Sequence, residues 1–556
     1  MARRITKRDE SALGNSDKKA DDSEGLDAHA DTSKESQWDD ECAVFILKQS
    51  VLSRCLLFLV QFVFNALVTD FPTDAFKGIP VAEGWYLQLK DVSLEVGVVE
   101  ANGVRIHIAE ELSFADRFIH FALSGLSRWD AVHFLHIMRY GYTYENTLAF
   151  FPLFPTVIYY STIIWSWAAP FLHFTTALML TAVTVNFVCF LLCAQLLYAL
   201  LLVITKSAKI SLLGCLVLTL NPASIFFSAI YSETVFMVLT LCGLMMLYMD
   251  PTLPFIRHII AAFFFALAFA TRSNGLLNFG YIAFHLFAET IFSPSERKFL
   301  WRRDCGTILL KILRFVSVGF ICWTIQSSMV IWHGARMQRA FCSGDSFKVF
   351  PESVIAFANE NSLVLPHQLD NLTWCRNEDC RNERIVLNPM PTFYASIQRK
   401  YWDVKPFGYW QLKKFPCFAM AAPALLIVLC GCVQEINIVR ARGSFSKMLV
   451  ALFDPFSTFP FAVHAFVLSL SAIVLYNVEV ATRILFSSSP FIYVVLARYM
   501  DQRTPLVTLD DLQYPPLLPF FTNFSRTHFV HALLLAYLLS YFFIGTVLHV
   551  NWLPFT

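Results

Sequence analysis

The sequence predicts an all-α integral membrane protein that crosses the bilayer many times. Apolar residues make up 56% of the 556 residues and charged residues only 15%, against about 45–50% and about 25% in soluble domains. Apolar windows of about 20 residues, the length that spans a bilayer as a helix, recur along the chain. A body so poor in charge cannot cover itself with a polar surface, so lipid is expected to surround most of it.

The first 41 residues are the exception to this composition. They hold 12 acidic and 7 basic side chains and too few apolar residues to offset the entropy of ordering. We therefore predict a disordered cytosolic tail over residues 1–41 and a polytopic membrane domain over residues 42–556. Because the chain opens with hydrophilic residues, no secretory signal is expected.

The predicted spans follow one another and give roughly 11–13 crossings. In chain order the apolar windows lie at residues 54–70, 152–171, 177–204, 208–228, 229–249, 255–271, 274–292, 306–333, 416–434, 450–475, 484–500 and 528–548. Two hydrophilic segments, residues 71–147 and 334–414, stand out between them.

Charge predicts on which side of the membrane these segments lie. The loops 296–303 and 435–447 carry seven basic side chains, and the positive-inside rule places both in the cytosol. Segment 334–414 is one crossing away from each, so we expect it on the far side. Segment 71–147 belongs on that side too if the N-terminal tail is cytosolic.

The order of the windows requires one interruption. Six apolar windows lie between segment 71–147 and the cytosolic loop 296–303. Two segments on opposite sides of the membrane must be separated by an odd number of crossings, so one of the six windows cannot be a complete crossing. We expect the break within residues 208–249, where Asn221, Pro222, Ser232 and Glu233 interrupt the apolar run. Irregular backbone is tolerated at membrane depth only where it is buried in protein or lines a watery cavity, so the break points to a site.

The far side has features of the endoplasmic reticulum (ER) lumen. Asn371-Leu372-Thr373 is an acceptor sequence for N-glycosylation. Cys375 and Cys380 lie in the same segment and could form a disulfide in an oxidising compartment. These features predict that segment 334–414 is lumenal and that Asn371 is glycosylated.

Metal, cofactor and nucleic-acid functions are not expected. Most of the 14 cysteines lie inside apolar runs, where they are typical of small core residues. We find no paired Cys and His spacing of the zinc-binding kind. A net charge of +1 provides no electrostatic footprint for nucleic acid.

The densest run of chemically useful residue types is residues 125–134. Asp130 beside Trp129 suits a general base in a partly apolar pocket, where burial raises the pKa of the carboxyl. A helix-capping Asp after an interfacial Trp explains the same pair. His133 shares the face of Asp130 if this stretch is helical, and either binds substrate or satisfies a neighbour. Glu145, which follows soon after, either binds substrate or is a solvated charge in a loop.

Charged side chains inside the predicted spans form a second group. Glu233, Arg272 and Arg483 lie within or at the end of apolar runs, where charge is costly and indicates function by default. The two arginines could clamp the phosphate of a lipid-linked substrate or extend to the membrane interface. Asn274 follows Arg272 closely and is assigned to the same group.

Seven short blocks, in order, carry a resemblance that extends from about residue 50 to the end. They are residues 127–131, 149–152, 221–223 with 231–233, 272–276, 401–402 with 421–423, 482–483 with 487–490, and 551–554. In these blocks the chain resembles the GPI mannosyltransferases of the PIG-V type. The first 41 residues have no counterpart in that family.

The resemblance implies a GT-C glycosyltransferase fold with a catalytic first lumenal loop, in the ER membrane. It implies transfer of the second mannose, in α-1,6 linkage, from dolichyl-phosphate mannose to mannosyl-glucosaminyl-phosphatidylinositol. The Trp-Asp pair of the family corresponds to Trp129 and Asp130, which makes Asp130 the general base of an inverting displacement. Many relatives carry Glu where this chain has Val132, so a second acid, if needed, would be another such as Glu145.

The remaining site residues follow from the same scheme. We assign them to substrate binding, with Arg272 or Arg483 as the cation that stabilises the leaving phosphate: Trp129, His133, Glu145, Glu233, Arg272, Asn274 and Arg483. The partners expected are the two lipid substrates and membrane lipid, and the prediction leaves room for a small accessory membrane subunit.

Two alternatives stay open at this point. Another glycosyltransferase with a dolichol-phosphate-sugar donor would share the fold, but many such enzymes place two acids close together in this loop. A non-enzymatic subunit or transporter of the same pathway would tolerate loss of Asp130, and transporters tend to show internal repeats, which we do not find.

Overall fold

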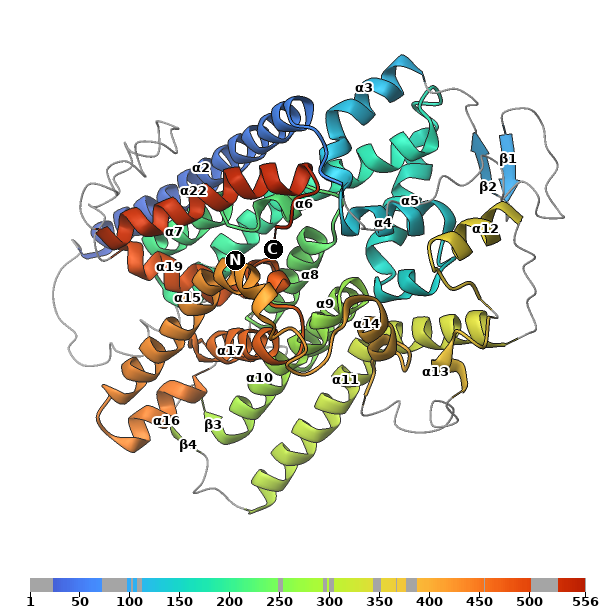
Figure 1. The fold of residues 1–556 in the computed structure, drawn as a ribbon. Coiled ribbons are helices and arrows are strands. Elements are labelled where there is room, and N and C mark those ends of the chain that lie inside the picture. The colour runs from blue at the N-terminus through green and yellow to red at the C-terminus, as the bar shows by residue number, and fades with distance from the viewer. Residues whose placement is uncertain are drawn as a thin grey trace.

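A computed structural model shows a bundle of helices with a few short strands (Figure 1). The structure describes residues 24–72, 98–101, 104–107, 113–248, 254–293, 298–299, 305–343, 352–366, 368–376, 388–454, 456–501 and 529–555. The first and last of the described helices, α2 (Glu24–Leu67) and α22 (Phe529–Val550), lie side by side. The predicted fold class, an α-helical membrane protein, is confirmed.

The elements between α2 and α22 follow in chain order. The first half contains β1 (Val98–Ala101), β2 (Val104–His107), α3 (Phe114–Leu123), η2 (Ser124–Ser127), α4 (Asp130–Tyr140), η3 (Glu145–Ala149), α5 (Leu153–Ser166), α6 (Phe174–Thr205), α7 (Ala208–Thr219), η4 (Ser224–Phe227), α8 (Glu233–Leu247), α9 (Pro254–Thr271), η5 (Ser273–Asn278) and α10 (Phe279–Ile291). The second half contains β3 (Phe292–Ser293), β4 (Lys298–Phe299), α11 (Cys305–Cys342), α12 (Glu352–Glu360), α13 (Thr373–Arg376), α14 (Tyr394–Trp402), η8 (Leu412–Lys414), α15 (Phe415–Arg440), α16 (Phe445–Phe453), α17 (Phe459–Val474), η9 (Val478–Val480), α18 (Ala481–Ser488) and α19 (Pro490–Asp501). The strands pair antiparallel, β1 with β2 and β3 with β4.

Fewer helices than predicted are long enough to cross a membrane. Within the described residues five helices pass by length and composition, and a sixth if the pair α18 and α19, bent by 80°, is one span. Four further apolar helices have only 10–17 residues. The sequence predicted roughly 11–13 crossings because hydropathy does not distinguish an apolar helix that faces lipid from one that is buried among other helices.

The predicted interruption within residues 208–249 is confirmed. Helix α7 ends at Thr219, the chain passes through the 3₁₀ turn η4, and α8 begins at Glu233. Every residue from 211 to 237 is buried. The break is held by the buried Arg54 of α2, whose guanidinium donates to the carbonyl oxygens of Thr219 (3.2 Å) and Ser224 (3.0 Å). Protein groups therefore replace the helix hydrogen bonds that the break removes.

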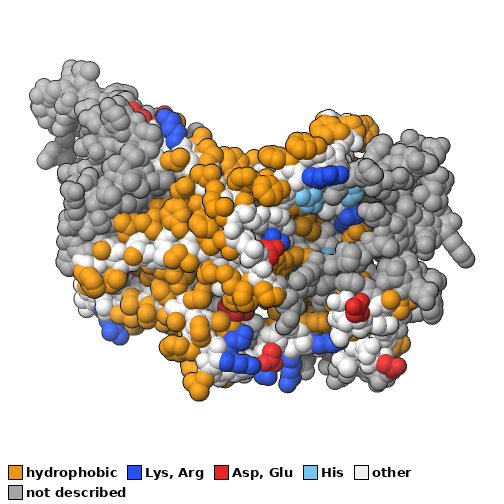
Figure 2. All heavy atoms as spheres, turned by 45° about the horizontal axis from the view of Figure 1, so that its top comes forward, with side chains coloured by type: hydrophobic (Ala, Val, Ile, Leu, Met, Phe, Trp, Pro, Cys, Tyr) orange, Lys and Arg blue, Asp and Glu red, His pale blue; other side chains and the backbone are white. Residues whose placement is uncertain are grey.

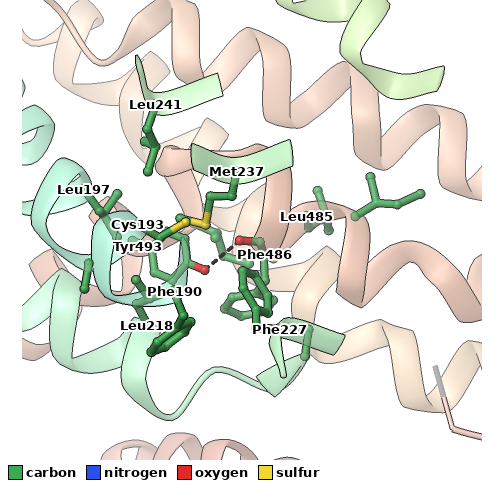
Figure 3. Close-up of a cluster of buried hydrophobic side chains, with 14 of the residues drawn as sticks. Phe190, Cys193, Leu197, Leu218, Phe227, Met237, Leu241, Leu485, Phe486 and Tyr493 are labelled. Atoms are coloured by element: carbon green, nitrogen blue, oxygen red, sulfur yellow. Dashed lines mark hydrogen bonds between the residues drawn. The ribbon is translucent and has the colours of Figure 1, made fainter. Parts of the chain in front are cut away.

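The core beneath this break joins helices from both halves of the chain (Figure 3). Phe190 and Cys193 of α6 and Met237 of α8 lie in one buried cluster with Phe486 of α18 and Tyr493 of α19. The Tyr493 hydroxyl donates to the Phe486 carbonyl oxygen (2.6 Å) across the bend between α18 and α19. This packing fixes the position of α18, which carries Arg483.

The outer surface agrees with a lipid environment. On the face in Figure 2, hydrophobic side chains cover a broad band of the described surface. Large apolar side chains of α11, including Leu310 and Phe320, are exposed on the outer surface of the protein.

Helix α2 extends into the N-terminal tail. It includes residues 24–41, which belong to the tail predicted to be disordered. Residues 1–23 lie outside the described residues.

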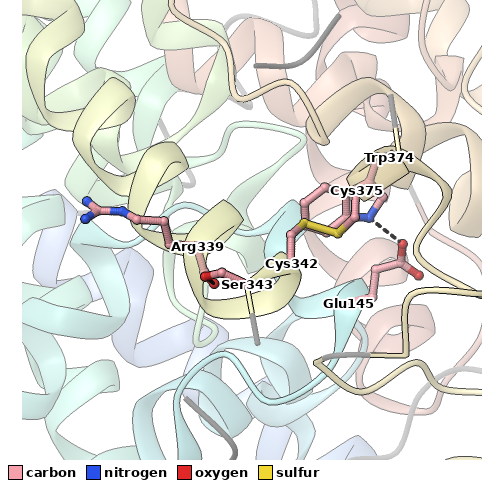
Figure 4. Close-up of a disulfide and its surroundings, with 6 residues drawn as sticks. All are labelled: Glu145, Arg339, Cys342, Ser343, Trp374 and Cys375. Carbon is pink, nitrogen blue, oxygen red and sulfur yellow. Dashed lines mark hydrogen bonds between the residues drawn. A yellow bond between two sulfur atoms is a disulfide. The ribbon is translucent and has the colours of Figure 1, made fainter. Parts of the chain in front are cut away.

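Segment 334–414 forms a small hydrophobic core together with Leu148 and Ala149 of η3. Phe341 at the end of α11 packs with Trp374 of α13 and Ile397 of α14. A disulfide joins Cys342 to Cys375, with 5.5 Å between their Cα atoms (Figure 4). The predicted pairing of Cys375 with Cys380 was therefore wrong, because the fold brings the end of α11 against α13. Cys380 itself lies outside the described residues.

Candidate active site

Asp130 is the first residue of α4 and follows a strained residue. Trp129 has φ 57° and ψ −124°, a conformation that a bulky side chain rarely adopts. Tertiary contacts hold it: its ring packs against Trp552 at 5.5 Å. The buried Tyr231 hydroxyl accepts a hydrogen bond from the Asp130 backbone N–H (3.2 Å) and donates to the Arg128 carbonyl oxygen (3.3 Å). Strain of this kind persists only where the surroundings enforce it, and it clusters at functional sites.

Four charged side chains from distant parts of the chain form one network. Arg483 Nη1 lies 2.8 Å from Asp130 Oδ2, and Arg483 Nε lies 3.6 Å from Glu233 Oε1. Arg272 forms a second ion pair with Glu233. Two carboxylates thus balance two guanidinium groups, which lowers the cost of burying all four.

Asp130 is the most open member of this network. Its side chain is 27% exposed, whereas that of Glu233 is 0% and those of Arg272 and Arg483 are 14% and 15%. The acid predicted as the base is therefore the one that a substrate hydroxyl could reach. Glu233 instead holds the two arginines in place from below.

The predicted direction of the pKa shift of Asp130 was wrong. Loss of solvent around Asp130 does raise the pKa of its carboxyl, but the charge and hydrogen bond of Arg483 outweigh this effect. The charge of Arg272, and that of His133 when its imidazole is protonated, lower the pKa of Asp130 as Arg483 does. The pKa of Asp130 consequently lies below its usual range, and its side chain is a carboxylate at neutral pH.

The turn after α9 is fixed next to α18. Arg272 Nε donates to Asn274 Oδ1 (3.4 Å), and Asn274 Nδ2 donates to Ser488 Oγ at the end of α18 (2.7 Å). Gln326 of α11 donates to the Gly275 carbonyl oxygen (3.0 Å). Asn274, predicted to bind substrate, thus contacts Arg272 and α18 in this structure.

His133 lies in α4 one turn after Asp130, as expected for a helix. Its ring is buried and stacks on Phe150, with 4.6 Å between the centroids. Burial lowers the pKa of His133 to about 4, although the nearby charge of Asp130 acts in the opposite direction. The imidazole is therefore neutral at pH 7.

Comparison with known proteins identifies the family. The family model "Mannosyltransferase (PIG-V)" matches residues 43–556. The chain belongs to the PIG-V family of mannosyltransferases. Like other members of a glycosyltransferase family, this PIG-V protein is an enzyme of that class, and the non-enzymatic alternative is disfavoured.

Several relatives support this PIG-V assignment. The GPI mannosyltransferase pigv-1 of Caenorhabditis elegans is 31% identical over 93% of this chain and 81% of its own length. The human GPI alpha-1,6-mannosyltransferase 2 is 26% identical over 92% of this chain and 98% of its own. An oligosaccharyltransferase structure from Archaeoglobus fulgidus is 10% identical, and the alignment covers 89% of this chain and 55% of that one with a TM-score of 0.38.

Glu145 lies apart from the charged network of this PIG-V protein. Its buried carboxylate accepts hydrogen bonds from Trp374 Nε1 (2.8 Å), Lys400 Nζ (2.5 Å) and Tyr401 OH (2.9 Å). These donors belong to segment 334–414 and occupy both carboxylate oxygens. The acid that accompanies Asp130 is therefore Glu233, and Glu145 joins the two hydrophilic segments.

Sequence reasoning missed two residues of the PIG-V site. Tyr231 holds the start of α4, and His549 Nε2 of α22 lies 3.3 Å from the Tyr231 hydroxyl. Tyr231 could have been found because it stands next to Ser232-Glu233 in one of the seven blocks. His549 has no local signal in its apolar helix. Among the described residues, no group of three or more His, Cys, Asp or Glu side chains could hold a metal.

Proposed function

We propose that this chain adds the second mannose, in α-1,6 linkage, to the GPI-anchor precursor. The donor is dolichyl-phosphate mannose, the acceptor is mannosyl-glucosaminyl-phosphatidylinositol, and transfer takes place at the lumenal face of the ER membrane. The relatives named GPI mannosyltransferases support the reaction. The observation that carries the proposal is the Asp130–Arg483 pair (2.8 Å), a partly exposed carboxylate beside a less exposed cation.

The chemistry needs one base. The donor mannose is β-linked to phosphate and the product is α-linked, so a single inverting displacement suffices. As the acceptor 6-hydroxyl attacks the anomeric carbon, its proton passes to the Asp130 carboxylate. The bond between that carbon and the phosphate oxygen breaks, and dolichyl phosphate leaves with the electron pair.

The leaving phosphate needs a cation and no general acid, because it departs already charged. Arg483 is the better placed of the two candidate arginines, since it contacts the proposed base directly. Its guanidinium also lies over the rings of Phe226 (5.4 Å) and Tyr231 (5.7 Å), which fix its plane. Arg272 supports it through Glu233. The rest of the rate enhancement comes from holding two lipid-bound substrates together.

The side of the membrane can be tested at the predicted glycosylation site. Asn371 and Thr373 are both exposed at the start of α13, where an oligosaccharide has room. We expect the full chain from cells to lose one glycan in Thr373→Ala and Asn371→Gln but to keep it in Thr373→Ser, which preserves the acceptor sequence. The measurement is gel mobility before and after endoglycosidase digestion. An unglycosylated wild-type Asn371 would contradict this prediction.

The proposed reaction is tested by complementation. Wild-type protein is expressed in cells that lack their own second GPI mannosyltransferase, and microsomes from these cells receive dolichyl-phosphate [³H]mannose. We expect surface GPI-anchored proteins to return and the one-mannose glycolipid to gain a label that α-1,6-mannosidase releases. Persistence of the one-mannose intermediate, with the protein at normal abundance in the ER, would reject the proposal.

A further inference from the structure

Residues 400–410 comprise the last residues of α14 and most of the connection that leads to η8 and α15, and we call them the strap. The strap contacts two parts of the protein that are far apart in the chain. On one side lies η3, which precedes α5, and on the other lies the connection between α17 and α18. Each contact is a hydrogen bond or a packed aromatic ring.

Glu145 fastens the first end of the strap. Lys400 and Tyr401 both donate to its Oε2, and Trp374 donates to its Oε1. Figure 4 shows the Trp374 indole pointing at Glu145, next to the disulfide that ties Cys375 to α11. A buried carboxylate that is satisfied by three donors holds its partners in one geometry, because leaving it unpaired is costly.

The second end is fastened to the approach to α18. The Phe407 backbone N–H donates to the Val474 carbonyl oxygen (2.8 Å), and Trp410 Nε1 donates to the Ile473 carbonyl oxygen (2.8 Å). The Tyr409 hydroxyl donates to Glu479 Oε2 (2.5 Å). Glu479 lies four residues before Arg483, so this end of the strap holds the turn that leads into the arginine.

Trp402, in the middle, contacts both sides of the site. Its ring lies 6.1 Å from that of His133 in α4 and 6.0 Å from that of Phe150. Its carbonyl oxygen accepts a hydrogen bond from Asn477 Nδ2 (3.3 Å), just before η9. His133 follows Asp130 by one turn of α4, so Trp402 links the helix of Asp130 to the approach to Arg483.

The Asp130–Arg483 pair bridges two groups of helices. Helix α4 packs on α5 and α6, whereas α18 packs on α8, α15, α17 and α19. The two groups pack on each other through α6 and α8, and Tyr231 and Glu233 join them at the base of the site. The strap joins them again from the side of segment 334–414.

We propose that the strap sets the distance between α4 and α18 and thereby holds Asp130 against Arg483, with Glu145 and Glu479 as the positioning residues that fasten it. The inference rests on the proposed function, because it presumes that this pair carries the chemistry. In this proposal Glu145 positions the strap and does not contact the substrate.

The test compares variants of the full-length protein purified in detergent. Glu145→Leu removes every hydrogen bond to the Glu145 carboxylate, and Glu479→Leu removes the bond from the Tyr409 hydroxyl while the two bonds to the carbonyl oxygens of Ile473 and Val474 stay. Glu145→Gln keeps an amide oxygen that Trp374 or Tyr401 can use. Asp403→Asn is the matched control, because Asp403 lies in the strap and, among the described residues, forms an ion pair with Lys405 alone, at the surface. Turnover is measured with dolichyl-phosphate mannose and a synthetic mannosyl-glucosaminyl-phosphatidylinositol acceptor.

We expect kcat to fall about 10- to 100-fold in both Leu variants, the range typical of a small misplacement of catalytic groups, with little change in KM. Glu145→Gln should recover most of the loss and Asp403→Asn should match the wild type. In the Leu variants the acid limb of the pH profile should move to higher pH. The reason is that Arg483, when it lies farther from Asp130, lowers the pKa of the Asp130 carboxyl less. Arg272, His133 and Tyr231, which also face Asp130, are left in place.

Hydrogen exchange on the same samples without substrate separates the strap from the chemistry. Faster exchange confined to α4 and residues 473–488 is expected in the Leu variants. If the Leu variants show the exchange rates and the kcat of the wild type, the proposed role of the strap is overturned, even if Asp130→Asn is inactive. Faster exchange throughout the protein with an unmoved acid limb would also overturn it, since that marks general destabilisation. An active Asp130→Asn protein would instead overturn the proposed function.

Discussion

Asp130→Asn is expected to lower kcat about 10³-fold, within the range of 10²–10⁴ typical of a lost general base. Asparagine keeps the size of the side chain and an oxygen that can accept from Arg483, so binding and folding should change little. It cannot take the proton of the acceptor hydroxyl. The measurement is the initial rate in microsomes with both lipid substrates, normalised to the abundance of the protein.

The control for this prediction is the same chemical change at a carboxylate outside the site. Asp403 is 59% exposed and pairs with Lys405, so Asp403→Asn should keep the wild-type rate. Full activity of Asp130→Asn at normal abundance would remove Asp130 from the role of base. Glu233, the other acid of the network, would then be tested next, because the carboxylate of Glu145 is already occupied by three donors.

Arg483→Met should lower kcat by about 10²- to 10³-fold, the cost of losing one group that stabilises developing charge. The variant also leaves Asp130 without its closest cation. Burial then acts on the pKa of Asp130 with less opposition, so this pKa should rise from below 3.8. A base works when deprotonated, so activity is lost as pH falls through its pKa. The acid limb of kcat/KM should therefore lie at higher pH in Arg483→Met than in the wild type.

A second, partly buried arginine pair provides the matched control. Arg498 of α19 pairs with Glu435 of α15, away from the charged network around Asp130. Arg498→Met removes an arginine from a comparable pair and should leave the acid limb in place. The measurement is kcat/KM against pH for the three proteins. An unchanged acid limb and rate in Arg483→Met would show that Arg483 neither supports the leaving phosphate nor tunes Asp130.

Much of the candidate site could be predicted from the sequence because its signals are local. Charges are costly in apolar runs, which singled out Glu233, Arg272 and Arg483 without any knowledge of their partners. The pair Trp129 and Asp130 stood out within the first predicted lumenal segment, residues 71–147. The role of Glu145 could not be predicted, because the sequence does not distinguish a loop glutamate exposed to solvent from one that accepts hydrogen bonds from three donors in another segment.

The sequence by itself determined the membrane class, the two hydrophilic segments and the break between α7 and α8. Each depends on local hydropathy, which a folded environment does not reverse. Only the tertiary structure decided that Asp130 pairs with Arg483, that Cys342 bonds Cys375, and that the pKa of Asp130 falls. Those outcomes depend on which distant helices pack together, and apolar helices of this kind carry almost no sequence signal for their neighbours. Which of the described helices are long and apolar enough to span was also visible only in the structure, because lipid and protein surroundings favour the same apolar residues.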